Sequence, residues 1–370
     1  MNALLGVIFH FIGGFASGSF YIPYKKVKGW AWETYWLIGG LFSWLVVPPI
    51  AAWLTIPDFT QIIAEADKSV IGYAYLFGVL WGIGGLTYGL GVRYLGVSLG
   101  SSVILGLCMV FGALIPAIYY QFNPAEGKDM ITSLTHTGWG RTVLAGLLVC
   151  IVGIVLCGKA GMMKEKELAG VGGKEARPDS DAEAHLSGKD EYKFGLGIFV
   201  AIVSGILSAC FNFGIEAAKP MAEVANSLWK EAHPGQGEFL FQNNVSYIVI
   251  LWGGLTTNLI WCLLLNVRNK TYGDYANSSA PVIRNIIFCA LAGTTWFLQF
   301  FFYGMGESKL GNGASSWILH MAFIILIANV WGLILKEWKG VSKKTLVTVI
   351  AGILVILLSV LLVGWGNSMR

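Results

Sequence analysis

The sequence predicts an all-α integral membrane protein whose ten transmembrane helices form two inverted five-helix repeats. Three observations predict this fold: the composition, a series of long apolar segments, and one motif that recurs in both halves of the chain. The 370 residues are 55% hydrophobic and only 12% charged, with a mean hydropathy of +0.65. A soluble domain carries about 25% charged residues, so this composition favours a protein that lies within a bilayer.

Apolar segments of membrane-spanning length recur from one end of the chain to the other. About 20 apolar residues in a helix cross the hydrocarbon core of a bilayer, and the hydrophobic pattern contains ten such segments. The first is expected to be a retained helix, because it lacks the basic region and the cleavage site of a signal peptide. The ten helices are expected near residues 4–24, 34–55, 70–92, 98–121, 140–158, 194–217, 240–265, 285–305, 311–335 and 345–366.

One long polar segment divides the ten predicted helices into two groups of five. It runs over residues 159–193, is rich in Lys, Glu, Asp and Gly, and has almost no large apolar side chains to bury. We therefore expect a first five-helix repeat over residues 1–158, a polar linker over 159–193 and a second five-helix repeat over 194–370. Because five is odd, the second repeat must cross the membrane in the opposite sense, as in the inverted repeats of secondary transporters.

A motif in the second half of the chain has a diverged copy in the first half. Six identical residues recur at one constant spacing, which is the mark of an internal repeat. Both copies contain two glycines separated by one residue, and helices interrupted at matching positions point to the binding site of a transporter. We therefore expect both helices to break at these glycines. In the alternative interpretation, the glycines of the helix near residues 70–92 only let neighbouring helices pack closely. The identical pairs are Trp81 and Trp296, Tyr88 and Tyr303, Gly89 and Gly304, Gly91 and Gly306, Leu95 and Leu310, and Gly96 and Gly311. Ser101-Ser102 and Ser315-Ser316 follow and match with a one-residue gap.

The positively charged residues predict how the chain is oriented. Most of the lysines and arginines lie in loops that follow odd-numbered helices, the polar linker included. Loops rich in Lys and Arg stay in the cytoplasm. The linker is therefore expected in the cytoplasm, and both termini are expected outside.

Other features of the composition argue against several classes of function. The net charge of +4 is small and spread along the chain, so no nucleic-acid partner is expected. All six cysteines fall within apolar segments, where they are expected to pack rather than to form disulfides or bind zinc. The sequence contains no metalloprotease, hydrolase or phosphate-binding motif, which argues against a membrane-embedded enzyme. Neither a metal nor a cofactor is expected.

Ionisable residues within the predicted helices are the candidates for a functional site. Such residues are costly in a membrane, and by default they face the interior of the bundle or a cavity. His10 and His320 lie within predicted helices, and Asn212 and Glu216 share a helix face because they are four residues apart. In the alternative interpretation, the histidines only hydrogen-bond neighbouring helices, and Glu216 pairs with Lys219 at the membrane interface.

Six short blocks stand out from the hydrophobic background, and they are Tyr21-Ile-Pro-Tyr-Lys-Lys-Val-Lys-Gly-Trp-Ala-Trp-Glu33, Arg93-Tyr-Leu-Gly96, Ala217-Ala-Lys-Pro-Met221, Leu298-Gln-Phe-Phe-Phe-Tyr303, Trp317-Ile-Leu-His-Met321 and Leu335-Lys-Glu-Trp338. They resemble the L-rhamnose–proton symporters, a family of the drug/metabolite transporter superfamily. The resemblance runs nearly end to end. It implies a multi-pass protein of the bacterial inner membrane that takes up L-rhamnose or a related 6-deoxyhexose, driven by a proton gradient.

Under this resemblance, the partners are a small sugar and the lipid bilayer, and the proton is the coupling ion. Aromatic side chains are expected to stack on the apolar face of the sugar, and amides and hydroxyls to bind its hydroxyl groups. Proton coupling is expected at His320, with His10 and Glu216 as alternatives, because a histidine or a buried glutamate can titrate near neutral pH. The expected sugar-binding residues are Trp296, Gln299, Tyr303, Ser316, Trp317, Asn212, Trp81 and Tyr88.

Another function remains open on the sequence alone. A drug or metabolite exporter of the same superfamily would have the same composition and the same number of helices. It would be distinguished by efflux of cations rather than by counterflow with a sugar. The oligomeric state stays open as well.

Overall fold

The computed structural model describes residues 2–95, 97–125, 128–171, 194–276, 280–336 and 338–370 of the chain. These residues form helices joined by short loops, and ten helical segments are long and apolar enough to cross a membrane. The prediction of an all-helical protein with ten spans is therefore confirmed. Most segments begin and end within a few residues of their expected positions.

The first half of the chain supplies five of the candidate spans. The first span consists of α1 (Asn2–Ser19) and the single turn α2 (Tyr21–Tyr24), and the second joins α3 (Trp32–Gly40), the π-helical turn η1 (Leu41–Val46) and α4 (Val47–Thr55). After the short helix α5 (Phe59–Glu65), the chain continues through α6 (Lys68–Leu95), α7 (Val97–Phe122), the short α8 (Ile131–His136) and α9 (Gly138–Val171).

The second half supplies the other five candidate spans. They are α11 (Phe194–Ala217), α13 (Asn244–Asn269), α14 (Val282–Leu310), α15 (Gly313–Ile334) and α16 (Lys343–Ser368). The amphipathic helix α12 (Lys219–Ala232) follows α11, and the 3-10 turn η2 (Tyr272–Ala276) precedes α14.

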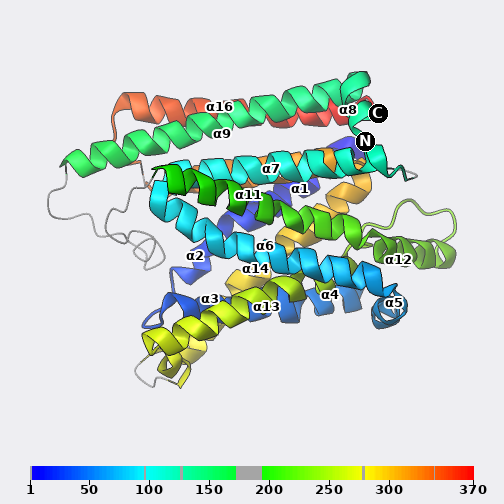
Figure 1. Cartoon of the computed structure of the whole chain (residues 1–370), viewed down its shortest axis with the longest axis horizontal. Coiled ribbons are helices and arrows are strands. Elements are labelled where there is room, and N and C mark those ends of the chain that lie inside the picture. Colours follow the sequence, from blue (N-terminus) through cyan, green and yellow to red (C-terminus); the bar gives the residue numbers. More distant parts are fainter. Residues whose placement is uncertain (1, 96, 126–127, 172–193, 277–279, 337) are drawn as a thin grey trace.

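The helices lie side by side with roughly parallel axes, so the bundle has two ends (Figure 1). Both chain termini lie at one end, which we call the terminal end, whereas α9 finishes at the other, which we call the opposite end. The two halves of the chain interleave, because α1 packs on α14 and α15, and α11 packs on α6 and α7. The centre of the bundle is therefore built by helices from both halves.

Glycines allow the interleaved helices to approach one another closely. A methyl group at Gly78 of α6 would overlap the carbonyl oxygen of Ile250 in α13, and one at Gly293 of α14 would overlap that of Gly39 in α3. Small residues at such crossings let two backbones come into contact within a membrane.

The helix breaks expected at Gly89 and Gly91 and at Gly304 and Gly306 are wrong. Helix α6 is continuous to Leu95, and α14 is continuous to Leu310. Glycine keeps its backbone N–H and can remain helical when neighbouring helices hold it in place; a methyl group at Gly306, for example, would lie 2.7 Å from His10 Nε2.

The second helix instead ends at Gly311, which has a φ of 62°. This left-handed conformation favours glycine and often terminates a helix. The chain then starts α15 at Gly313, where the Asn312 side chain caps the helix by accepting the Ser315 N–H at 2.6 Å. The matching position in the first half, Gly96, lies outside the described residues.

Helix α9 continues beyond residue 159, where the polar linker is expected to start, and ends at Val171. A helix propagates through charged residues when they can reach water, so polarity alone did not mark its end. Residues 172–193 of the expected linker lie outside the described residues. All six cysteines are buried and free.

Candidate functional site

Two buried histidines lie near the centre of the bundle. His10 of α1 and His320 of α15 are almost fully shielded from solvent, and their ring centroids are 6.2 Å apart. None of their four ring nitrogens has a hydrogen-bond partner among the residues that the structure describes. Buried polar atoms in proteins are normally paired, so packing alone does not explain this pair.

Tyr303 of α14 lies against both histidines. Its ring centroid is 5.3 Å from that of His10 and 5.2 Å from that of His320. Its hydroxyl donates a hydrogen bond to Asn212 Oδ1 at 3.4 Å, and Asn212 Nδ2 donates to the carbonyl oxygen of Gly112 at 2.7 Å. These bonds connect α14 through α11 to α7.

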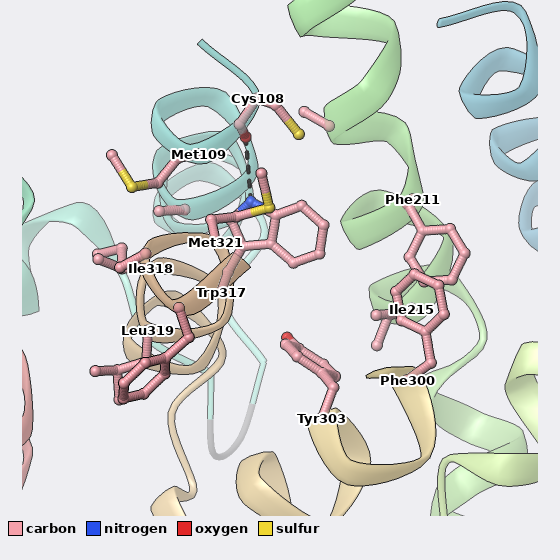
Figure 2. Packing of buried hydrophobic residues seen from close by; sticks show 14 of the residues in the cluster. Cys108, Met109, Phe211, Ile215, Phe300, Tyr303, Trp317, Ile318, Leu319 and Met321 are labelled. Atoms are coloured by element: carbon pink, nitrogen blue, oxygen red, sulfur yellow. Dashed lines mark hydrogen bonds between the residues drawn. The ribbon is translucent and has the colours of Figure 1, made fainter. Parts of the chain in front are cut away.

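Trp317 lies beside Tyr303 and connects α15 to α7 (Figure 2). The two ring centroids are 6.1 Å apart, and the indole N–H donates to the carbonyl oxygen of Cys108 at 3.1 Å. Ser316 precedes it and lies one helical turn before His320. The Ser316 hydroxyl is buried and has no hydrogen-bond partner in the described part of the chain. We refer to His10, Asn212, Tyr303, Ser316, Trp317 and His320 as the central cluster.

Three tryptophans from separate helices meet next to the central cluster. The ring of Trp44 in η1 lies 6.2 Å from that of Trp81 in α6 and 6.0 Å from that of Trp296 in α14, and the last two are 5.7 Å apart. Phe300 joins this tryptophan group to the cluster, because its ring lies 5.2 Å from Trp296 and 6.1 Å from His320.

Four of the sequence-predicted residues can be placed relative to this tryptophan group. Trp81 and Trp296 belong to it. Gln299 is buried on α14 and donates a hydrogen bond to the carbonyl oxygen of Trp296 at 3.0 Å. Tyr88 lies apart, towards the end of α6, where its hydroxyl donates to Ser101 Oγ at 2.7 Å. The structure thus brings most of the predicted residues together, with Tyr88 and Glu216 as the exceptions.

A polar cavity of about 240 Å³ reaches the central cluster from the terminal end. It lies beside the last turns of α7 and the first turn of α15, and Asn212 forms part of its wall. We call it the terminal cavity. Its other polar walls include Glu216, Lys219, Gln242 and Glu307.

The charged groups in this cavity form two ion pairs. Glu216 pairs with Lys128 at 2.5 Å and accepts the hydroxyl of Tyr120 at 3.0 Å. Lys219 pairs with Glu307 at 3.0 Å. The alternative in which Glu216 pairs with Lys219 is therefore wrong. Helix α11 ends at Ala217, and Lys219 begins α12, so the two side chains do not continue along one helix face.

Sequence reasoning missed Glu307. Its side chain is only 6% exposed, and its second oxygen accepts a hydrogen bond from Asn243 Nδ2 at 2.6 Å. It follows Tyr303 by one helical turn. A carboxylate at the end of a predicted span, on the same face as a candidate site residue, was a signal that could have identified it.

A third ion pair lies at the edge of the terminal cavity. Arg370 pairs with Asp129 at 3.0 Å, and Asn312 Nδ2 donates to the same carboxylate at 2.6 Å. Burial raises the pKa of the Asp129 carboxyl above its ordinary value, and the Arg370 guanidinium partly opposes this shift.

A second cavity, of about 250 Å³, lies towards the opposite end. It adjoins the start of α7 and the last turns of α15, and its walls include Tyr88, Ser101, Cys157, Asn329 and Trp338. We call it the opposite cavity. The central cluster thus lies between two cavities that approach it from the two ends of the bundle.

Comparison with known proteins identifies the family. The family model of the L-rhamnose-proton symport protein (RhaT) matches residues 1–369. The chain belongs to this family. Curated relatives include the L-rhamnose-proton symporters of Yersinia pestis (strain Pestoides F) and of Yersinia pseudotuberculosis serotype O:1b (strain IP 31758). Each is 36% identical over 371 residues, which cover 99% of this chain and 98% of the relative.

These matches confirm the resemblance seen in the sequence. They also confirm that the chain belongs to a class of transporters and not of enzymes. With its ten candidate spans, the chain is a multi-pass membrane protein.

The buried Lys219–Glu307 pair leads to a testable expectation about stability. Glu307→Ala leaves the mostly buried Lys219 cation without its partner, and breaking such a pair from one side costs about 3–5 kcal/mol. The double variant Lys219→Met/Glu307→Ala should recover part of this loss, because no unpaired charge remains. The free energy of unfolding is measured by denaturant titration in detergent micelles.

Glu238→Ala is the matched control for Glu307→Ala. Glu238 pairs with Lys309 at 3.5 Å, but its side chain is 51% exposed. Its loss should cost less than about 1 kcal/mol. Equal losses in the free energy of unfolding for Glu238→Ala and Glu307→Ala would contradict the assignment of Lys219 and Glu307 as a buried ion pair.

Proposed function

We propose that this chain is a secondary transporter that takes up L-rhamnose together with protons across a bacterial inner membrane. The observation that carries this proposal is the match of the L-rhamnose-proton symport family over residues 1–369. Relatives that carry the name L-rhamnose-proton symporter match over nearly the full length of both chains. A buried pair of titratable rings between two cavities supports the same function, because a symporter must bring its proton and its substrate to a site that either side can reach.

The sugar site in this proposal lies at the central cluster and the adjoining tryptophan group. Pyranose rings have an apolar face, and a 6-deoxy sugar adds a methyl group, so the rings of Trp81, Trp296, Tyr303 and Trp317 provide stacking surfaces. The polar groups for its hydroxyls are then Asn212, Gln299 and Ser316. Tyr88 would contact the sugar from the side of the opposite cavity.

Binding at this site requires the helices to separate. The cavity next to Trp296 measures only about 10 Å³, which is about the minimum for one water molecule. In the state described here, the tryptophan group is therefore closed, whereas the terminal cavity already reaches Asn212 of the central cluster.

Proton coupling is assigned to His320, with His10 and Glu216 as alternatives. His320 and His10 are close enough that a proton on either ring would raise the cost of a second proton on the other. Glu216 is the alternative that lies in the terminal cavity, but its carboxylate is already paired with the Lys128 ammonium in the state described here.

The two halves are proposed to be inverted repeats related by a two-fold axis in the membrane plane. Equivalent close contacts support this arrangement. Gly78 meets the carbonyl oxygen of Ile250, and Gly293 meets that of Gly39. Gly78 and Gly293 are separated by the same number of residues as the two tryptophans of the repeated motif, so the two contacts correspond.

Two further contacts lie where such an axis would pass. The rings of Trp81 and Trp296, which correspond in the repeat, are 5.7 Å apart. In the pair α9 and α16, Gly153 faces the backbone nitrogen of Ile356, whereas Gly352 faces that of Cys157. Reciprocal contacts of this kind are expected when a two-fold axis relates two helices.

The proposed orientation places both termini outside and the linker at residues 159–193 in the cytoplasm. It rests on the basic loops and agrees with the positions of the termini and of the end of α9 at opposite ends of the bundle. Alkaline phosphatase is active only outside the cytoplasm, so a fusion at Arg370 should be active and one within the linker inactive. The reverse pattern of activity would overturn the proposed orientation.

Uptake measurements test the function directly. Proteoliposomes with the purified chain should accumulate labelled L-rhamnose when the outside is made acidic, and a protonophore should abolish the accumulation. A second 6-deoxyhexose and a hexose with an intact 6-hydroxyl test whether the methyl group is recognised. Efflux of an organic cation without any sugar uptake would favour the exporter.

The role of His320 can be separated from sugar binding. His320→Gln keeps hydrogen-bonding capacity but cannot titrate near neutral pH. The variant should exchange labelled for unlabelled L-rhamnose near the wild-type rate, yet it should lose accumulation driven by the pH gradient.

His10→Gln and Glu216→Gln are the matched variants, because each removes one alternative proton carrier. Wild-type accumulation in His320→Gln would exclude this residue as the obligatory carrier. Loss of exchange as well as accumulation would instead show that His320 contacts the sugar.

A further inference from the structure

Two tyrosines that correspond in the repeated motif have different hydrogen-bond partners. The Tyr88 hydroxyl donates to Ser101 Oγ at 2.7 Å. Its counterpart Tyr303 donates to Asn212 Oδ1 at the longer distance of 3.4 Å. Ser315 corresponds to Ser101 when a gap of one residue is allowed between the tyrosine and the serine of the second repeat. The bond between tyrosine and serine is therefore present in one half of the chain and absent from the other.

Ser315 is a polar residue in the core whose side chain has no evident role in the state described here. Ser315 is fully buried, and its hydroxyl has no hydrogen-bond partner within the described ranges of the chain. Its backbone N–H is fixed by Asn312, so the residue is held at the start of α15. A buried hydroxyl without a partner is costly. A hydrogen bond that this hydroxyl forms in another state of the molecule would explain why a serine occupies the position.

The two tyrosines occupy different environments that match their different bonds. Tyr88 and Ser101 join the end of α6 to the start of α7, and both line the opposite cavity. In the second half, α14 and α15 pack on each other less extensively than α6 and α7 do. The terminal cavity lies there, between Ser308 of α14 and Ala314 of α15. The bonded pair thus joins two helices beside the opposite cavity. In the other half, Asn212, which accepts from Tyr303, and Ala314, which precedes Ser315, line the terminal cavity.

We propose that Ser101 and Ser315 are positioning residues that hold Tyr88 and Tyr303 alternately during transport. In the state described here, the Tyr88–Ser101 bond closes the path from the opposite cavity to the centre. In the alternate state, Tyr303 leaves Asn212 and bonds Ser315, which closes the path from the terminal cavity, while Tyr88 leaves Ser101. This inference rests on the proposed transport function and on the proposed inverted repeat.

If the two tyrosine–serine bonds alternate, replacing Ser101 and replacing Ser315 should shift the equilibrium between the two states in opposite directions. Ser101→Ala removes a bond from the described state and an unpaired hydroxyl from the alternate state. Ser315→Ala removes an unpaired hydroxyl from the described state and a bond from the alternate one. Because a conformational equilibrium shifts only by the difference in free energy between its states, Ser101→Ala should favour the alternate state and Ser315→Ala the described one.

Thiol labelling in detergent, without sugar or a pH gradient, measures this balance. Native Cys157 lines the opposite cavity, and a Ser308→Cys substitution places a thiol in the terminal cavity. Rates of N-ethylmaleimide labelling at each site are read by peptide mass spectrometry. Ser101→Ala should raise the Cys157 rate and lower the rate at position 308, so that the ratio of the two rates changes by about fivefold for one neutral hydrogen bond. Ser315→Ala should shift both rates in the opposite direction.

Two further variants separate this role from general loosening of the bundle. Ser359→Ala removes a buried hydroxyl that donates to the carbonyl oxygen of Ile356 in its own helix and also bonds the Cys150 thiol, but contacts neither tyrosine, and it should leave both rates unchanged. Ser316→Ala tests whether the neighbouring serine is the true partner of Tyr303. The proposal is overturned if Ser101→Ala and Ser315→Ala shift the rates in the same direction, if neither shifts them, or if only Ser316→Ala opposes Ser101→Ala.

The labelling result does not depend on which substrate the protein carries. A protein that fails to accumulate L-rhamnose but shows the opposed shifts would contradict the proposed function and leave the serine exchange supported. A protein that accumulates L-rhamnose without these shifts would support the proposed function and contradict the serine exchange.

Discussion

The hydrocarbon core of a bilayer holds no water, so a polar atom buried within a helix bundle depends on partners within the protein wherever no cavity reaches it. The chain meets this constraint largely with backbone carbonyls. Asn212 and Trp317 donate to carbonyl oxygens of α7, and the hydroxyl of Ser204 in α11 donates to that of Gly84 in α6 at 2.9 Å. The ring nitrogens of His10 and His320 are among the buried polar atoms that lack such a partner in the described part of the chain, and these two rings lie together at the candidate site.

The packing of the helices explains why the candidate site contains residues from both halves of the chain. Because α1 packs on α14 and α15, His10 comes from the first half, whereas Tyr303 and His320 come from the second. Relative movement of the halves would change the distances within the cluster more than movement within either half. In a site built from both halves, a substrate that enters from one side of the membrane can change how the helices pack towards the other side.

Hydropathy predicted the ten spans because the length of an apolar helix and the thickness of the bilayer are directly related. The cost of polar groups in a membrane likewise identified His10 and His320. Sequence spacing failed where the backbone changes direction: Glu216 and Lys219 are neighbours in the sequence, but the turn between α11 and α12 sends Lys219 to Glu307. The partner of Glu216 lies in a loop of the other half, and no local pattern relates two such distant positions.

The contact between Trp44, Trp81 and Trp296 has a consequence for spectroscopy. Their rings lie about 6 Å from one another, a separation at which excited indoles transfer energy among themselves. Light absorbed by any of the three is therefore shared, and their emission follows the most strongly quenched member. The three side chains come from three different helices, so their combined fluorescence lifetime is an intrinsic gauge of how tightly the middle of the bundle is closed.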